Sequence, residues 1–239
     1  MAYSPAVEEA LNELVVANHI LADHGVVDAY GHISMRHPER ADRYFLACSR
    51  APEQVRREDF IEFNLDSSPA EPESRPMYAE RPIHGCTYIA RPDVNAVCHN
   101  HAPASVPFGV TGTPMRPIWH VAAPIGYEVA TWDIMDEFGA TDLLVVTNEM
   151  GTSLAKALGP NASILMRGHG STVATGSVRA TVMTAVYLQE NAKLLSTALL
   201  MNPNVKYLAR EEVALATARQ CTPLALNRAW NAWVARLDS

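Results

Sequence analysis

Apolar residues recur at helical spacing in the first segment of the chain. Within residues 5–24 the apolar positions are Val7, Leu11, Leu14, Val15 and Leu21, and Gly25 follows them. This spacing places the apolar side chains on one face of a helix, and a glycine just past the last turn is a common helix end. The pattern therefore predicts a helix over 5–24 that packs against a core.

Shorter apolar runs have the length and composition of β-strands, several of them next to glycine turns. These runs are "DAYGHISMRHPE" (28–39, a turn followed by a strand), "YFLAC" (44–48), "DFIEFNLD" (59–66), "DVNAVCHNH" (93–101) and both halves of "SILMRGHGSTVATG" (163–176). A further run, "DLLVVT" (142–147), fits either a strand or the edge of a helix.

The remaining pattern predicts helices joined by proline-rich loops. The expected helices cover 81–92, 148–160, 177–201 with Ser177 as N-cap, 211–220 and 226–238. Loops and short pieces are expected at 66–76 and 102–127, where prolines are frequent. The mixed order of helices and strands has no dinucleotide-binding glycine fingerprint and no long linker. It favours one layered α/β domain over 1–239.

Composition and charge narrow the class of protein. The 239 residues are 48% hydrophobic, which is enough for a core, and the net charge is −7. An acidic chain lacks the basic face that sequence-independent binding to nucleic acid requires. The sequence also has no apolar run of membrane-spanning length and no basic stretch before an apolar leader. We therefore expect a cytoplasmic protein that acts neither on nucleic acid nor in a membrane, with its four scattered cysteines reduced.

Histidines supply the first candidate chemistry. His99 and His101 stand one residue apart at the end of a predicted strand, so both imidazoles face the same side. They are either metal ligands or ordinary polar residues where a strand leaves the core, since a metal site normally needs three protein ligands. His169, between Gly168 and Gly170, is a candidate third ligand or a turn residue. Glu80 precedes a predicted helix, where a lone carboxylate is usually only a favourable charge.

The order of short motifs carries a resemblance. The motifs are "GHIS", "ACSRAPE", "ERPIHG", "VCHNHAPAS" and "RGHGS". In this order they resemble the class II aldolase/adducin family, from about the first helix to the long helix. The resemblance implies a three-layer α/β/α fold with a mostly antiparallel central sheet, and a homotetramer.

The resemblance also implies a site. By motif, a divalent ion, Mn²⁺ or Zn²⁺, would be held by His99, His101 and His169, and Glu80 would be the catalytic acid/base. A tyrosine that the neighbouring subunit contributes in the family falls at His120, which becomes a second candidate acid/base. The C-terminal pair Trp230 and Trp233 would either cover a subunit interface or pack in the core.

Departures from the sugar-phosphate enzymes change the expected substrate. The family's phosphate-binding turns and serine pair are replaced here by Gly31-His32-Ile33-Ser34, Cys48-Ser49-Arg50 and Tyr78-Ala79. Arginine binds planar carboxylates through paired hydrogen bonds. We therefore expect a small carboxylic acid rather than a sugar phosphate. The candidate substrate-binding residues are His32, Ser34, Ser49, Arg50 and Arg81.

One branch of the family fits this change. Its members are metal-dependent decarboxylases of hydroxylated aromatic or muconic-type acids, and "PFGVTGTP", "LMRGHG" and "RAWNAW" are similar to it. The resemblance implies a carbon–carbon lyase that removes CO2 from an ortho-hydroxy aromatic or enol-type acid. Two alternatives remain: an aldolase or dehydratase of a non-phosphorylated hydroxy acid or sugar, and a non-enzymatic adducin-like scaffold.

Overall fold

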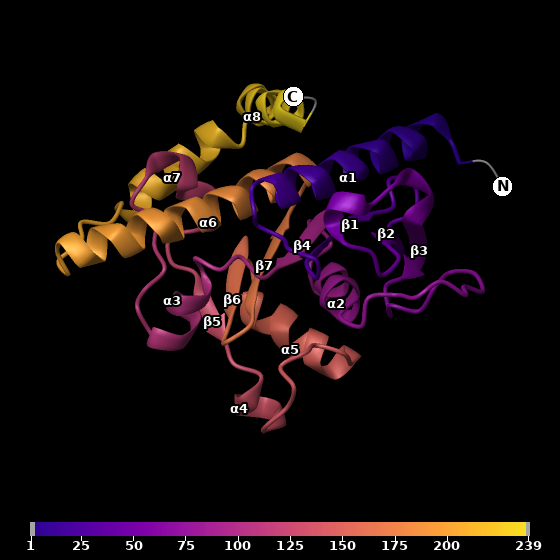
Figure 1. Ribbon diagram of the computed structural model, residues 1–239, viewed down its shortest axis with the longest axis horizontal. Coiled ribbons are helices and arrows are strands. Elements are labelled where there is room, and N and C mark those ends of the chain that lie inside the picture. Colours follow the sequence, from indigo (N-terminus) through magenta and orange to yellow (C-terminus); the bar gives the residue numbers. More distant parts are fainter. Residues whose placement is uncertain (1–2, 238–239) are drawn as a thin grey trace.

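A seven-stranded sheet forms the centre of the computed structural model, which describes residues 3–237 (Figure 1). The strand order is β3-β2-β1-β4-β7-β6-β5. The strands are β1 (His32–Arg36), β2 (Arg43–Ala47), β3 (Phe60–Asn64), β4 (Ala96–Asn100), β5 (Ala130–Trp132), β6 (Ser163–Met166) and β7 (Gly170–Thr175). All neighbouring strands are antiparallel except β5 and β6, which are parallel. The mixed, mostly antiparallel sheet confirms the expected α/β class.

Helices cover both faces of this sheet. In Figure 1, α1 (Pro5–Asp23) and α6 (Val178–Met201) lie above it, while α2 (Pro82–Ala90) and α5 (Asn148–Leu158) lie below it. The helices α1 and α6 pack against each other, as do α2 and α5. The C-terminal helices α7 (Arg210–Gln220) and α8 (Pro223–Leu237) lie outside α6 and complete the upper layer. The order helix, sheet, helix is the expected three-layer arrangement.

Short helices fill the connections. They are α3 (Val106–Thr111), α4 (Met135–Phe138) and the 3₁₀ turns η1 (Pro52–Gln54), η2 (Arg57–Asp59) and η3 (His120–Ile125). The caps follow the sequence: the Ser4 and Ser177 hydroxyls accept backbone N–H groups at the starts of α1 and α6. Gly25, with a φ of +61°, ends α1 in the left-handed conformation that glycine tolerates.

Most of the predicted elements are confirmed, and the strand alternative for 142–147 is wrong. These residues form an irregular segment whose last residue, Thr147, is the N-cap of α5. Leu143 there has a φ of +71°, a conformation that regular strands and helices do not use. The strand β5 and helix α4 were not predicted, because they fall in short segments without a clear period. Of the predicted helix 226–238, Asp238 lies outside the described residues.

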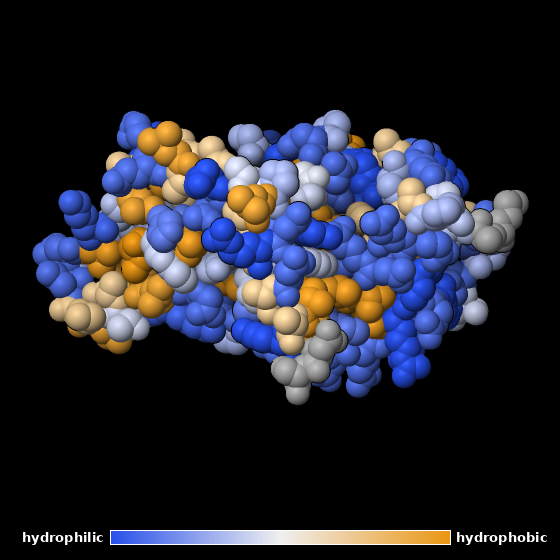
Figure 2. All heavy atoms as spheres, turned by 90° about the horizontal axis from the view of Figure 1, so that it is seen from above, coloured by the Kyte–Doolittle hydropathy of each residue, from blue (hydrophilic) through white to orange (hydrophobic). Residues whose placement is uncertain are grey.

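The outer face carries apolar side chains at one end. Figure 2 looks onto the C-terminal helices and shows hydrophobic atoms gathered toward the side where α6 ends. On α6, Leu194, Leu200 and Met201 are exposed, the last two at 89% and 82%. We call these three residues the apolar end of α6. Trp230 and Trp233, by contrast, are buried in α8. Among residues 3–237, the structure contains no helix with the length and apolarity needed to cross a bilayer.

Candidate active site

Strand pairing brings the three candidate ligands together. Strand β4 ends at Asn100, with His99 inside it and His101 just after it, and His169 lies in the turn before β7. The register pairs Asn100 with Ser171, so this turn lies beside the end of β4. A Cβ atom at Gly170 would lie only 2.0 Å from the Asn100 carbonyl oxygen, so this close approach requires glycine.

The cluster has the donor set of a metal site. Nε2 of His101 lies 3.1 Å from Nε2 of both His99 and His169, and Glu80 Oε2 lies 3.5 Å from Nε2 of His99 and of His169. The four donor atoms lie within 4.8 Å of one another. An ion with metal–nitrogen bonds of about 2.1 Å separates neighbouring ligands by about 3.0 Å in octahedral and about 3.4 Å in tetrahedral geometry. The observed separations therefore fit a divalent ion bound to imidazole.

Contacts behind the ligands orient two of the rings. The Nδ1 atom of His169 donates to the Leu143 carbonyl at 3.0 Å, which leaves its Nε2 lone pair directed at the cluster. The Nδ1 atom of His101 lies 3.4 Å from the Asp28 carboxylate. The buried Nδ1 of His99 has no hydrogen-bond partner in the described part of the chain. Burial, followed by the neighbouring histidines, lowers the pKa of His101, which favours the neutral, ligating form.

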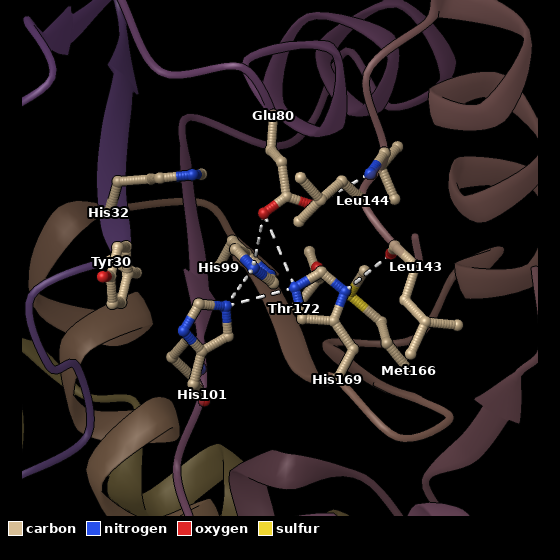
Figure 3. Close-up of polar contacts among 12 residues, drawn as sticks. Tyr30, His32, Glu80, His99, His101, Leu143, Leu144, Met166, His169 and Thr172 are labelled. Atoms are coloured by element: carbon tan, nitrogen blue, oxygen red, sulfur yellow. Dashed lines mark hydrogen bonds and ion pairs between the residues drawn. The ribbon is translucent and has the colours of Figure 1, made fainter. Parts of the chain in front are cut away.

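Glu80 is held beside these histidines (Figure 3). Its side chain is 7% exposed, and its Oε1 accepts the Val145 backbone N–H at 2.9 Å. Burial alone raises the pKa of Glu80, but the adjacent His99 and His169 outweigh it and lower this pKa overall. The carboxylate is therefore ionised, with one oxygen fixed by the 142–147 segment and the other facing the histidines.

A second group of polar residues adjoins the cluster through His32. The His32 ring contacts the rings of Tyr78 and His99, with centroids 4.5 Å and 5.2 Å away. Its Nδ1 lies 2.7 Å from Nε2 of His84 on α2. Burial lowers the pKa of His32 well below its usual value and the pKa of His84 to about 3, so both rings are neutral at pH 7.

Ser34 lies behind His84 rather than at the cluster. The Ser34 hydroxyl is fully buried and lies 2.6 Å from Nδ1 of His84 and 2.7 Å from the Tyr88 hydroxyl. We predicted Ser34 as a substrate contact, but its hydroxyl is used in these bonds inside the protein. It reaches the site only through His84 and His32.

The candidate arginines have their polar partners outside the histidine cluster. Arg50 Nε pairs with the Asp59 carboxylate at 3.0 Å, and the Arg50 carbonyl accepts the Tyr78 hydroxyl. Arg81 donates to the backbone carbonyls of Ser67 and Tyr78. Both side chains thus have internal partners.

Two further candidates lie on the surface. Ser49 is exposed, and its backbone N–H donates to the Pro76 carbonyl. His120 is exposed at the first residue of η3. Within residues 3–237 no hydrogen bond or ion pair joins it to the cluster, and a role from a neighbouring subunit stays a prediction.

His84 and Tyr88, and the backbone of Leu143 and Val145, were not predicted as parts of the site. His84 and Tyr88 are four positions apart on α2, and their partners His32 and Ser34, which were predicted, are two apart on β1. These spacings place each pair on one face of its element and could have signalled a shared polar contact. The contribution of Leu143 and Val145 has no such signal, because it is made by backbone atoms.

Comparison with known proteins decides the family. A family profile described as the class II aldolase and adducin N-terminal domain matches residues 12–196. The chain belongs to this family. The decarboxylase tropJ of Talaromyces stipitatus is 32% identical to this class II aldolase family member, over 92% of this chain and 91% of its own length. The 3,4-dihydroxyphthalate decarboxylase of Arthrobacter keyseri is 30% identical over 80% of each chain.

Solved structures agree on the fold. An aldolase II superfamily protein from Pseudomonas syringae superposes on this class II aldolase family member with a TM-score of 0.81. The two are 21% identical, and the match covers 99% of this chain and 94% of the other. The expected fold and family are confirmed. The expected class of enzyme, a carbon–carbon lyase with carboxy-lyase first, agrees with the decarboxylases that this chain resembles.

Proposed function

We propose that this protein is a divalent-metal-dependent decarboxylase of an ortho-hydroxy aromatic or enol-type carboxylic acid. The convergence of His99, His101, His169 and Glu80 within 4.8 Å carries the proposal. The names of the two decarboxylase relatives support the direction of the chemistry. His32 and Tyr78, which take the place of the family's phosphate-binding residues, support a substrate without phosphate.

The metal and the histidines have separate tasks. When bound, Mn²⁺ or Zn²⁺ supplies Lewis-acid stabilisation of the negative charge that develops on the substrate oxygen as CO2 leaves. The three histidines present imidazole nitrogens at two adjacent strand ends, so they would hold the ion with three protein ligands, and a substrate with two oxygens would complete its coordination.

Glu80 moves the proton. Its ionised carboxylate accepts the proton of the ortho-hydroxyl and returns it to the ring carbon that carries the carboxylate. The substrate is then a β-keto acid, whose ketone accepts the electron pair when the carbon–carboxylate bond breaks. CO2 departs, the aromatic oxygen regains its charge, and solvent supplies the final proton.

The proposal also covers the domain organisation, the cellular location and the oligomeric state of the protein. We take 1–239 as one domain of a cytoplasmic homotetramer, with the apolar end of α6 buried between copies. Exposed apolar side chains of this size are typical of contact surfaces, which supports an oligomer. The substrate would be a small carboxylic acid.

The test combines substrates, metal and variants. Purified protein loaded with Mn²⁺ or Zn²⁺ is offered hydroxylated benzoates, hydroxylated phthalates and aldol substrates, and released CO2 and aldehyde are measured. We expect CO2 from at least one acid, and a loss of about a hundredfold or more after chelation or in His99→Ala, which also loses the metal. His19→Ala, a histidine outside the cluster, is the matched control and keeps both.

Two results would contradict the proposal. Release of aldehyde without CO2 from any acid would favour the aldolase alternative. Equal CO2 release by metal-free and metal-loaded protein would remove the role assigned to the histidines.

A further inference from the structure

A line of buried hydrogen bonds leads from Tyr88 to His32. We propose that this line fixes the His32 imidazole with its proton on Nε2, so that His32 presents a hydrogen-bond donor to the substrate. The inference rests on the proposed function for the identity of the ligand, a carboxylic acid, but not for the direction of the hydrogen bonds.

The direction is set at the Tyr88 end. The Tyr88 hydroxyl is buried and lies 2.7 Å from the Ser34 hydroxyl oxygen. A backbone hydrogen bond from Val97 favours the ionised form of Tyr88, so it is an N–H that donates and cannot accept the Tyr88 proton. A buried hydroxyl that does not donate leaves a polar hydrogen unsatisfied, so Tyr88 donates to Ser34. The Ser34 proton must then go to its other partner, Nδ1 of His84, at 2.6 Å.

The two histidines transmit this direction. Because Nδ1 of His84 accepts, the proton of this neutral ring is on Nε2. That Nε2–H donates to Nδ1 of His32 at 2.7 Å. Nδ1 of His32 is therefore an acceptor, and the His32 proton is on Nε2. The opposite direction would strand the Tyr88 proton inside the core.

The His32 end of this line of hydrogen bonds faces the cluster of Glu80 and three histidines. Figure 3 shows the His32 imidazole pointing toward Glu80 and His99. Within the described residues Nε2 of His32 forms no hydrogen bond, and the protein does not enclose this atom completely. An N–H in this position favours an oxygen acceptor such as a carboxylate or ketone and disfavours a group that can only donate, such as an ammonium. His32 is thus a specificity residue, and His84, Ser34 and Tyr88 are its positioning residues.

The first experiment reads the proton positions directly. Zinc-loaded protein with ¹⁵N-labelled histidine is measured by long-range ¹H–¹⁵N correlation, which distinguishes the two neutral forms of each ring. We expect His32 and His84 both to carry the proton on Nε2. A proton on Nδ1 of His32 in the wild-type protein would overturn the inference.

Two tyrosine variants separate the line from general packing. Tyr88→Phe removes the group that sets the direction, and we expect a detectable population of His84 with the proton on Nδ1. Tyr44→Phe is the matched control, because the Tyr44 ring is also buried and packs on Tyr88 but its hydroxyl bonds to Ser67 and the Arg81 carbonyl. This control keeps the wild-type proton positions. A change that is equal in both variants would contradict the role of Tyr88.

The second experiment measures what the donor does. Binding of 2-hydroxybenzoate to zinc-loaded protein is followed by calorimetry, with zinc content measured in each sample. His32→Leu removes the donor and should weaken binding about tenfold or more, whereas His32→Gln, whose amide offers an N–H at a similar reach, should stay within about threefold. Equal binding by His32→Leu and wild type would overturn the donor role.

The readouts distinguish the two proposals. Protein that shows the expected proton positions and binding but releases no CO2 from any acid would contradict the proposed decarboxylation alone. Protein that releases CO2 but carries the His32 proton on Nδ1 would contradict the hydrogen-bond line alone.

Discussion

Glu80 stands where a carboxylate is usually only a favourable helix-end charge, yet its two oxygens have different partners. Oε1 accepts a backbone N–H, and Oε2 faces two imidazoles. That asymmetry suits a proton carrier, because one oxygen fixes the group while the other stays free to exchange a proton.

Glu80→Gln tests this role. The amide oxygen can still accept the Val145 N–H, but the side chain cannot take up a proton. We expect metal content to stay within about twofold of wild type and CO2 release to fall by about 10² to 10⁴. Glu149→Gln, at the exposed start of α5, is the control. Unchanged turnover in Glu80→Gln would reduce Glu80 to a structural charge.

Gly170 offers a prediction on stability. Alanine there would place its Cβ 2.0 Å from the Asn100 carbonyl oxygen, so the paired strands must separate. We expect Gly170→Ala to lower the free energy of unfolding by about 3 kcal/mol or more.

Gly176→Ala is the matched control for that prediction. At this position the nearest atom lies 3.6 Å from the new Cβ, and the change should stay within about 0.5 kcal/mol. Urea denaturation of the metal-free proteins measures both. Equal stability of the two variants would contradict the argument from close approach.

At the scale of elements, local patterns predicted the long helices and the central strands but not the short elements and irregular segments that connect them. The helix over 5–24 and the strand before His101 follow from apolar spacing that tertiary structure does not override. The segment 142–147 looked like a strand because its residues are apolar, but its backbone polar groups bond to Glu80 and His169 instead of a neighbouring strand. Motif order predicted the four residues that lie together in the cluster. The partners of Arg50 and Arg81 could not be predicted, because tertiary contacts that sequence spacing does not encode determine them.

The pairing of β1 with α2 through His32 and His84 predicts a pH dependence. The pKa of His84 is about 3 in the folded protein because burial, and then His99, disfavour its charged form. In the unfolded chain a histidine titrates near 6.5. Between these values the unfolded state binds more protons, so this contribution to stability is complete above about pH 6.5 and is lost as the pH falls, by about 1.4 kcal/mol per pH unit.

Urea denaturation of metal-free protein at pH 7 and pH 5 checks this dependence. The wild type should lose about 2 kcal/mol more than His84→Gln over this interval. The same loss in both proteins would show that His84 gains its proton in the folded state as easily as in the unfolded chain.

At the scale of the whole molecule, the site and the apolar end of α6 are different surfaces. The site lies at the ends of β4 and of the β6–β7 turn, in the sheet layer, while Leu200 and Met201 end a helix of the outer layer. If copies of the chain associate through that helix end, assembly and metal binding can be disturbed separately.

A double substitution tests the association. Leu200→Glu with Met201→Glu places two charges on the apolar end of α6, which a buried contact does not tolerate. We expect light scattering after gel filtration to give four chain masses for the wild type and a smaller mass for the double variant, with metal content unchanged. Leu224→Glu, on an exposed leucine of α8, is the control. A wild-type monomer would contradict the proposed tetramer.

The register of β4 against β7 has a consequence for how the protein folds. The Ser171 hydroxyl bonds to Asn100 across 71 positions of sequence, and this pairing sets the distance between His101 and His169. Such a long loop closes late in folding, because the chain loses conformational entropy on closure before the contacts between the two strands stabilise it. Uptake of zinc during refolding would therefore mark the moment at which the central strands join. The signal of a zinc-sensitive dye in a stopped-flow mixer would then give the rate of this step without any label on the chain.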